Sequence, residues 1–133
     1  MTSPASDRIV IDASAFAAVI FGEPEGDAIW PRLRGASLFA PTLLPFELSS
    51  VARKKMRRAP ADAARILVAL ATALEPRWGL MWCDVDAADA VLIASATGLT
   101  TYDASYLWLA GSLGAELLTL DSRLAAAGAA MPV

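Results

Sequence analysis

The sequence predicts an α/β fold in which helices flank a central parallel-stranded sheet, with a helical hairpin added. Two observations indicate this class. Short apolar segments rich in β-branched residues alternate with longer segments of helical periodicity, and parallel strands need such intervening helices to connect them. A chain of 133 residues also suits one compact core, so we expect residues 1–133 to form a single domain.

The amino-terminal part is expected to form a strand and two helices. The segment "RIVID" is rich in β-branched residues and ends in Asp12, and "ASAFAAVIFG" has the pattern of a helix that Gly22 stops. A short helical stretch around "DAIWPRLRG" follows, which Pro31 should distort unless it starts a helical turn.

The middle of the chain is expected to contribute two strands and the helical hairpin. The short apolar segment Ser37–Ala40 is the second strand, and "LMWCDV" is the third. Between them, Pro45 suits the first turn of a helix that continues to about Arg58. Pro60 opens another helix, which continues to about Leu74 and completes the hairpin.

The carboxyl-terminal part is expected to alternate helices with one last strand. "DAADAVLIASATG" predicts a helix with an aspartate at its start and Gly98 at its end. The next helix should begin at Asp103 and continue to Gly114. "ELLTL" predicts a strand that ends at Asp121, and "SRLAAAG" a short final helix.

The composition excludes several kinds of enzyme. The sequence has no histidine, which rules out Ser-His-Asp and Cys-His nucleophiles, paired-histidine phosphodiester cleavage and histidine-bound zinc. Cys83 is the only cysteine, so we expect a buried structural thiol and no internal disulfide. Hydrolysis by this chain must therefore use carboxylates, and we expect them to act with a bound metal ion.

The sequence contains no sign of a membrane or exported protein. Its longest apolar run, Ile66–Leu74, is far shorter than the ~20 residues that span a bilayer. The amino terminus "MTSPASDR" lacks the basic start, apolar core and small-residue cleavage site of an export signal. We therefore expect a cytoplasmic protein with no membrane partner.

Charge is distributed unevenly along the chain. The net charge of -3 argues against attraction of nucleic acid by the whole surface, but "RKKMRR", residues 53–58, concentrates positive charge on one segment. A solvated helix end explains this basic segment at least as well on the residues alone, because cations are favoured near a helix carboxyl terminus.

Four acids occupy positions that need a physical explanation. Binding sites in parallel sheets form beyond the carboxyl ends of the strands, where Asp12 and Asp121 both stand. Glu47 lies on the apolar side of its helix, and glutamate is seldom buried without a partner. Capping of the following helix is an equal alternative for Asp12 and Asp121, and is by itself an adequate account of Asp103.

A cation becomes necessary if the topology brings these four acids together. Like charges about 4 Å apart repel by roughly 4 kcal/mol at an effective dielectric constant of 20. With oxygen ligands alone, a hard ion such as Mg²⁺ or Mn²⁺ fits best.

The same stretches resemble the PIN-domain ribonucleases, and within them the VapC toxins of bacterial toxin–antitoxin pairs. The similar stretches are "IVIDASAF" with Asp12, "APTLLPFELSSV" with Glu47, "LTTYDASYLWLAGSLGAELLTLD" with Asp103, and "TLDSRL" with Asp121. The resemblance covers nearly the whole chain, and its specificity lies in the order and spacing of the four acids.

What the resemblance implies is a PIN-like fold and a metal-dependent endoribonuclease that leaves a 5′-phosphate and a 3′-hydroxyl. The catalytic and metal-binding residues would be an acidic quartet around one or two Mg²⁺ or Mn²⁺ ions. Asp12 and Asp103 are expected as direct ligands. Glu47 and Asp121 are expected to act through water or a second ion.

Further residues acquire a role under this resemblance. Ser14 and Thr119 match small hydroxyl positions of the family and would orient carboxylates or waters, although a helix-start serine and an ordinary strand threonine are simpler accounts. Helical spacing from Glu47 leads to Lys54 and Arg58, which would extend from the site along an RNA backbone.

The resemblance also implies partners: an RNA substrate, a cognate VapB-like antitoxin and a second copy of the chain in a homodimer. Aromatic side chains are enriched at interfaces, so tryptophans are candidates for such contacts, with core packing as the alternative. The candidates are Trp30, Trp78 and Trp82. Tyr102, Tyr106 and Trp108 are assigned to packing.

Three other functions fit parts of the sequence. A receiver-type signalling domain also holds Mg²⁺, but its adjacent acidic pair after the first strand and its late-strand lysine are missing here. A carboxylate–metal phosphatase would need paired aspartates that "IDASAF" lacks. A PIN-fold protein that binds RNA without cleaving it stays open. No short motif encodes the RNA target, because recognition of single-stranded RNA depends on loop shape and base contacts.

Overall fold

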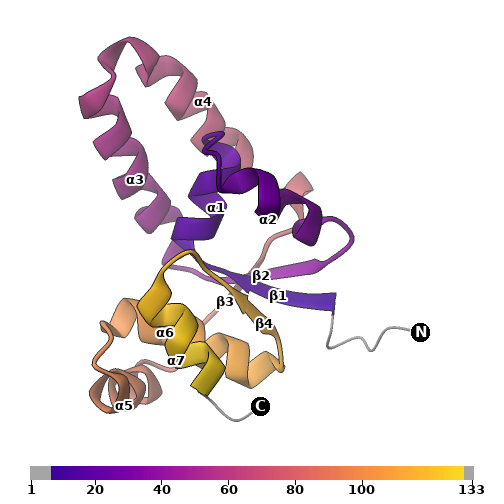
Figure 1. Ribbon diagram of the computed structural model, residues 1–133, viewed down its shortest axis with the longest axis vertical. Helices are drawn as coiled ribbons and strands as arrows, with labels where there is room; N and C mark the ends of the chain where they lie inside the picture. Colours follow the sequence, from indigo (N-terminus) through magenta and orange to yellow (C-terminus); the bar gives the residue numbers. More distant parts are fainter. Residues whose placement is uncertain (1–6, 131–133) are drawn as a thin grey trace.

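The computed structural model describes residues 7–130, in which helices cover both faces of a four-stranded parallel sheet (Figure 1). The predicted α/β class is confirmed. The strands are β1 (Arg8–Ile11), β2 (Ser37–Pro41), β3 (Met81–Cys83) and β4 (Glu116–Leu118). The α-helices are α1 (Ala13–Ile20), α2 (Gly26–Leu33), α3 (Leu44–Arg58), α4 (Ala63–Ala73), α5 (Ala87–Thr97), α6 (Thr101–Leu113) and α7 (Ser122–Ala130). The first six residues of the segment examined for an export signal lie outside the described residues.

The sheet has the order β3-β2-β1-β4, with every neighbouring pair parallel. Val10 and Ile11 of β1 are completely buried, as expected for a central strand covered on both faces. The chain places β2 and β3 on one side of β1 and β4 on the other. The strand order therefore reverses between β1 and β4, and ligands of open α/β sheets bind beyond the carboxyl ends of strands at such a point.

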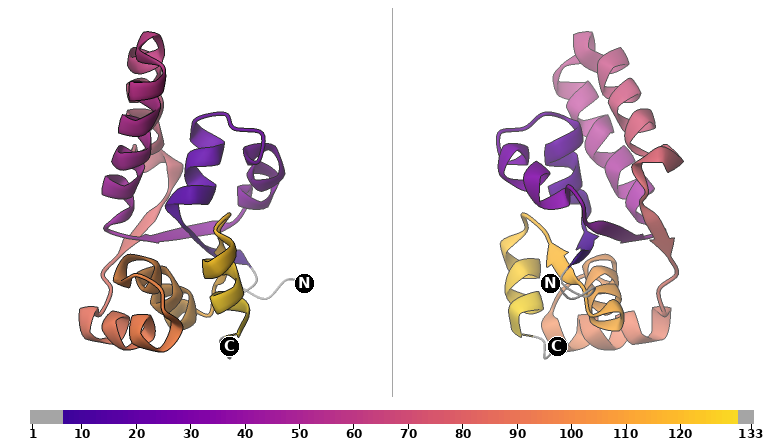
Figure 2. Two further views of the ribbon diagram at one scale, coloured as in Figure 1. Left: turned by 60° about the vertical axis from the view of Figure 1, so that its left-hand side comes forward. Right: turned by 90° about the vertical axis from the view of Figure 1, so that its right-hand side faces the viewer.

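The helices form two layers around the sheet (Figures 1 and 2). One layer contains α1, α2 and the hairpin of α3 and α4, whose tip projects beyond the rest of the molecule; the other contains α5, α6 and α7. Phe16 and Leu48 fill the core from the first layer, and Leu107 and Leu124 fill it from the second. The predicted hairpin is thus present and packs against α1.

Of the two expectations about prolines, the one about Pro60 needs correction. Helix α2 continues through Pro31 to Leu33, so Pro31 does not end the helix. The hydrogen bond that Pro31 cannot donate would have reached the carbonyl of Asp27, an exposed residue, so water can replace it. Pro60 opens a short 3-10 helix, η2 (Pro60–Asp62), and α4 begins only after it.

Some side chains are more exposed than the sequence suggested. Tyr102 is 64% exposed, so its assignment to packing was wrong. Trp30, Trp78 and Trp82 keep about two fifths of their surface in solvent (43%, 43% and 40%) and Cys83 is only half-buried. Within residues 7–130, no helix is long and apolar enough to cross a membrane.

Candidate active site

Among the helices that begin at the carboxyl edge of the sheet, four carry the candidate acids at their starts. Helices α1, α3 and α7 follow β1, β2 and β4, so they begin at this edge, while α6 begins there and runs back toward the start of β4. The acids are Asp12, Glu47, Asp103 and Asp121. A helix amino terminus bears partial positive charge, which favours a carboxylate in its first turn.

Asp12 is buried and accepts three hydrogen bonds. Its Oδ1 accepts from the Ser14 hydroxyl (2.7 Å) and from the Ala15 backbone N–H (3.0 Å). Its Oδ2 accepts from the Thr119 hydroxyl at 2.5 Å. Ile11 pairs with Leu118 in the sheet, which explains why the residues that follow each strand meet. Asp12 therefore caps α1 and also faces the edge of the sheet.

The Ser14 and Thr119 hydroxyls continue this network into the loop after β4. They lie 3.3 Å apart, and Ser14 Oγ accepts from the backbone N–H of Leu120 at 2.9 Å. Thr119 Oγ1 accepts from the backbone N–H of Asp121 at 3.0 Å. The network ties the start of α1 to the backbone that carries the fourth acid.

Glu47 lies half-buried in the first turn of α3 and contacts a residue of α6. The Tyr106 hydroxyl donates to Glu47 Oε1 at 2.5 Å. Burial raises the pKa of Glu47 above its ordinary value, the Tyr106 hydrogen bond partly lowers it, and the charges of Asp103 and Asp12 raise it further. The negative charges of Asp103 and Asp12 therefore both act on the Glu47 carboxylate.

Asp103 is the third residue of α6 and does not cap it, which corrects the prediction that the helix begins there. The cap is Thr100, whose hydroxyl accepts from the backbone N–H of Asp103 at 3.1 Å. Burial raises the pKa of the Asp103 carboxyl, and repulsion from Asp121 and Asp12 adds to this. The Thr100 hydrogen bond and the charge of Arg123 lower the pKa in part.

Asp121 lies three residues beyond the end of β4, so the prediction that the strand reaches it was wrong. The strand stops because Leu118 pairs with the last residue of β1, and the Thr119 hydroxyl then turns toward Asp12. Asp121 is exposed, and its Oδ1 accepts from the backbone N–H groups of Arg123 (2.9 Å) and Leu124 (3.0 Å). It therefore caps α7.

The donor atoms at this edge suit a hard cation. All four candidate side chains offer carboxylate oxygens, the ligands that Mg²⁺ and Mn²⁺ favour. Within the part of the chain that the structure describes, no three histidine, cysteine, aspartate or glutamate side chains converge into a ready-made metal-binding group. Mg²⁺ commonly uses one or two carboxylates and retains several waters, so it does not need three side chains as direct ligands.

Two residues near the acids were missed as site residues in the sequence. Tyr106 was assigned to packing, and its ring is indeed buried, but its hydroxyl contacts Glu47. Its position three residues after Asp103, on the same helical face, was the available signal. Arg123 also lowers the pKa of Asp103, and its guanidinium donates to the Gly98 carbonyl at 3.1 Å.

The basic segment on α3 is divided between two roles. Lys54 and Arg58 are exposed, so both remain accessible to a polyanion. Lys55 instead forms an ion pair with Glu23, and its ammonium lies 5.5 Å from the centre of the Phe21 ring. Lys55 therefore holds α3 to the segment after α1.

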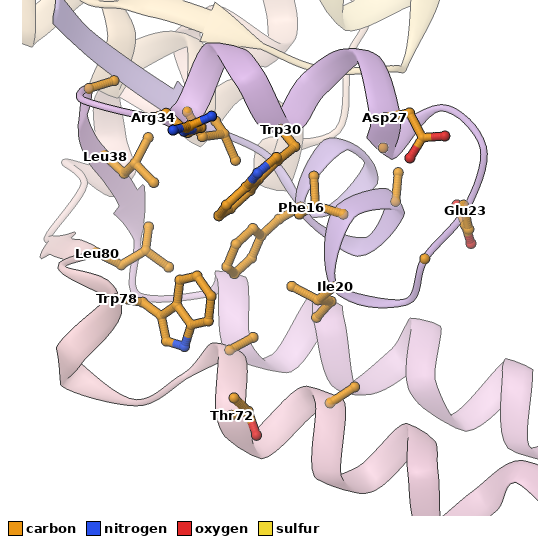
Figure 3. A pocket seen from close by; sticks show the side chains of 18 of the residues that line it. Phe16, Ile20, Glu23, Asp27, Trp30, Arg34, Leu38, Thr72, Trp78 and Leu80 are labelled. Atoms are coloured by element: carbon orange, nitrogen blue, oxygen red, sulfur yellow. The ribbon is translucent and has the colours of Figure 1, made fainter.

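An apolar pocket of about 730 Å³ lies away from the acids, between α1, α2 and the end of α4 (Figure 3). Its walls include Phe16, Leu80 and the rings of Trp30 and Trp78, which meet edge-to-face with their centres 6.2 Å apart. None of the four acids lines this pocket.

Comparisons with known proteins agree with this architecture. Among solved structures, the crystal structure of PAE2754 from Pyrobaculum aerophilum superposes with a TM-score of 0.73 at 28% sequence identity, covering 92% of this chain and 80% of that one. A comparison with curated proteins found no match. The alternative of a receiver-type signalling domain is excluded. Such domains have the strand order 2-1-3-4-5, whereas this sheet has the order β3-β2-β1-β4. Residues 9–130 match the model of the PIN domain, so the chain belongs to the PIN-domain family, whose members are generally nucleases.

Proposed function

We propose that this protein is a Mg²⁺- or Mn²⁺-dependent endoribonuclease whose active site is the acidic edge of the sheet, within one domain of residues 1–133. One observation carries this proposal. Four acids from four helix starts lie near enough to repel one another: burial is the main cause of the raised pKa values of Glu47 and Asp103, and the charges of the neighbouring acids raise both further. A divalent cation would remove that repulsion, which is otherwise a cost to the folded state.

The acids divide into two roles in this proposal. Asp12 and Asp103 bind the ion directly, and Glu47 and Asp121 act through water or a second ion. A bound divalent ion lowers the pKa of water and neutralises charge on the phosphodiester. The chain supplies the orientation: the hydroxyls of Ser14 and Thr119 hold Asp12, and the helix starts favour negative charge at the edge.

RNA would reach the site along α3. Lys54 and Arg58 are exposed and lie seven and eleven residues beyond Glu47, which places all three near one helical face. Basic side chains at these positions can neutralise successive phosphates by displacing their counterions. An acidic site beside a basic helix thus separates metal binding from substrate binding.

The direct test is RNA cleavage by purified protein with Mg²⁺ or Mn²⁺, beside Asp12→Asn and Asp103→Asn. Both variants should lose more than about 100-fold in rate, because even residues behind metal ligands typically contribute 10–100-fold. Asp27→Asn is the matched control, since Asp27 is exposed on α2. Equal cleavage by all four proteins, or none by the wild type on varied RNAs, would leave an RNA-binding role without cleavage.

The resemblance to VapC toxins supports a narrower proposal: the chain is the toxin of a toxin–antitoxin pair, acts as a homodimer and is inhibited by a VapB-like antitoxin. Expression of the wild type from a tightly repressed promoter should arrest growth, whereas Asp12→Asn should not. Sedimentation of the purified protein gives the oligomeric state. Unimpaired growth with active protein present would refute the toxin role and leave the nuclease proposal intact.

A further inference from the structure

Tyr106 combines a core side chain with a polar contact at the acidic edge. It is 1% exposed, and its ring belongs to the hydrophobic core. Its hydroxyl donates to Glu47 Oε1 at 2.5 Å, a contact between residues 59 apart in the sequence. A phenylalanine would fill the same core volume, so core packing explains the ring of Tyr106 but not its hydroxyl.

The hydrogen bond restricts Glu47 without using up its carboxylate. Glutamate has one of the most mobile side chains, and a short hydrogen bond from a buried donor selects among its rotamers. A carboxylate offers about four lone-pair sites, so one hydroxyl leaves most of them available to a cation or its waters. The contact therefore fixes where Glu47 lies and leaves it able to bind.

Helix α6 consequently contributes to the site twice. Asp103 lies in its first turn, and Tyr106 follows three residues later on the same face. One rigid helix thus carries one acid and the hydroxyl that holds another acid from α3. This contact directly joins the side chain of Glu47 to the helix that carries Asp103.

We propose that Tyr106 is a positioning residue of the metal site: its hydroxyl holds Glu47 in the place from which the carboxylate acts, through water or a second ion, beside the ion that Asp103 binds. This inference rests on the proposed function. Nothing in it requires Tyr106 to contact the ion or the RNA.

The test compares Mn²⁺ binding, measured by calorimetry, in the wild type and in Tyr106→Phe. We expect about tenfold weaker binding in Tyr106→Phe, a typical loss when a residue that orients a metal ligand is removed. Tyr102→Phe is the matched control, since it removes a hydroxyl from the same helix at an exposed position and should bind like the wild type. Unchanged affinity in Tyr106→Phe would overturn the proposal.

A double-variant cycle separates positioning from damage to the core. In a Glu47→Gln background, Tyr106→Phe should cause no further loss of Mn²⁺ affinity, because the residue it positions no longer acts as a charged ligand. An equal fold loss in both backgrounds would show a structural effect only and overturn the proposal. If wild-type protein neither binds Mn²⁺ nor cleaves RNA, the proposed function has failed instead.

A second measurement does not use the Tyr106→Phe variant, so it tests the proposal even if that variant does not fold. The chain has two tyrosines, so protein labelled with 3-fluorotyrosine gives two ¹⁹F resonances, which Tyr102→Phe assigns. Saturating Mg²⁺ should shift the Tyr106 resonance, and the shift should disappear in Glu47→Gln. A Tyr106 resonance unmoved by Mg²⁺ at concentrations that support cleavage would count against the proposal.

Discussion

A buried carboxylate such as Asp12 persists in a folded protein only when hydrogen bonds replace the water that it loses. Here two hydroxyls and one backbone N–H supply them. The same contacts fix the orientation of both carboxylate oxygens. Helix capping and a functional role, which the sequence presented as alternatives, are therefore compatible at this residue.

We predict that Thr119→Val lowers the free energy of unfolding by about 1–3 kcal/mol, because it leaves the buried Asp12 carboxylate short of one hydrogen bond. Thr119→Ser keeps the hydroxyl and should lose less. Chemical denaturation measures both. Ser49→Ala is the control for a lost hydroxyl, since Ser49 is exposed and donates only to the Pro45 carbonyl of its own helix. Equal stability of the valine and serine variants would contradict the prediction.

Glu47 and Asp103 also predict a pH dependence of stability. Their pKa values in the folded protein lie above the ordinary 4.5 and 3.8, so the folded state binds more protons than the unfolded chain between the ordinary and the raised values. The stability that these groups contribute is thus complete below the ordinary pKa values and is lost as pH rises through the raised ones.

Metal-free wild type should therefore lose stability relative to the Glu47→Gln, Asp103→Asn double variant as pH rises above about 4. Thermal unfolding at a series of pH values measures the difference. Added Mg²⁺ should reduce the loss in the wild type and leave the variant unaffected. A constant difference across the range would show that the two acids titrate at their ordinary values.

Among the elements, α1 and α2 lie in close contact at Gly26, the first residue of α2. This residue is buried, and a Cβ there would overlap the backbone carbonyl of Ala18, whose carbon would lie 2.8 Å away. Backbone cannot move aside as a flexible side chain can. Glycine at this position thus allows α2 to cover α1 in the layer above the sheet.

We predict that Gly26→Ala lowers the free energy of unfolding by about 1–3 kcal/mol, the usual cost of overpacking. Gly128→Ala is the matched control, because Gly128 is also helical and a Cβ there would meet only the ends of side chains, Leu117 at 3.3 Å and Leu107 at 3.6 Å. That variant should be neutral, or stabilised by up to about 1 kcal/mol through helix propensity. Denaturation midpoints of the two variants measure the difference. An equal loss of stability in Gly26→Ala and Gly128→Ala would refute the packing argument.

For the whole molecule, charge is separated in space although the net charge is only -3. Four acids lie at the carboxyl edge of the sheet, and exposed cations lie on α3. This helix belongs to the hairpin that projects from the molecule (Figure 2). Such a separation allows one molecule to hold a cation and a polyanion at neighbouring places.

Reversing the charges of Lys54 and Arg58 to glutamate should weaken RNA binding at least about tenfold at low salt and lower its salt dependence, with Mn²⁺ affinity unchanged. Fluorescence anisotropy with labelled RNA measures this. Arg77→Glu is the control, because Arg77 lies in η3 (Pro76–Trp78), which precedes β3 and so stands at the opposite edge of the sheet. Because the double variant reverses two charges and Arg77→Glu reverses one, an equal loss of affinity per reversed charge would mean that only net charge matters.

Local patterns were sufficient for most of the elements. Apolar periodicity and the positions of Pro45 and Gly98 located strands and helices to within a few residues. The start of α6 was misplaced because Thr100, and not Asp103, caps the helix. The end of β4 was misplaced because this strand can extend only as far as its partner β1. Such limits depend on neighbours that periodicity does not describe.

The sequence by itself determined the α/β class, the absence of histidine chemistry and the four acids as candidates, because these follow from residue types and their local order. Only the tertiary structure decided which groups meet. Thr119 reaches Asp12 because β4 pairs with β1, and Tyr106 reaches Glu47 because α3 and α6, from opposite layers, both begin at the carboxyl edge of the sheet. Contacts between residues so distant in the chain arise from strand pairing and helix packing, which no local pattern encodes.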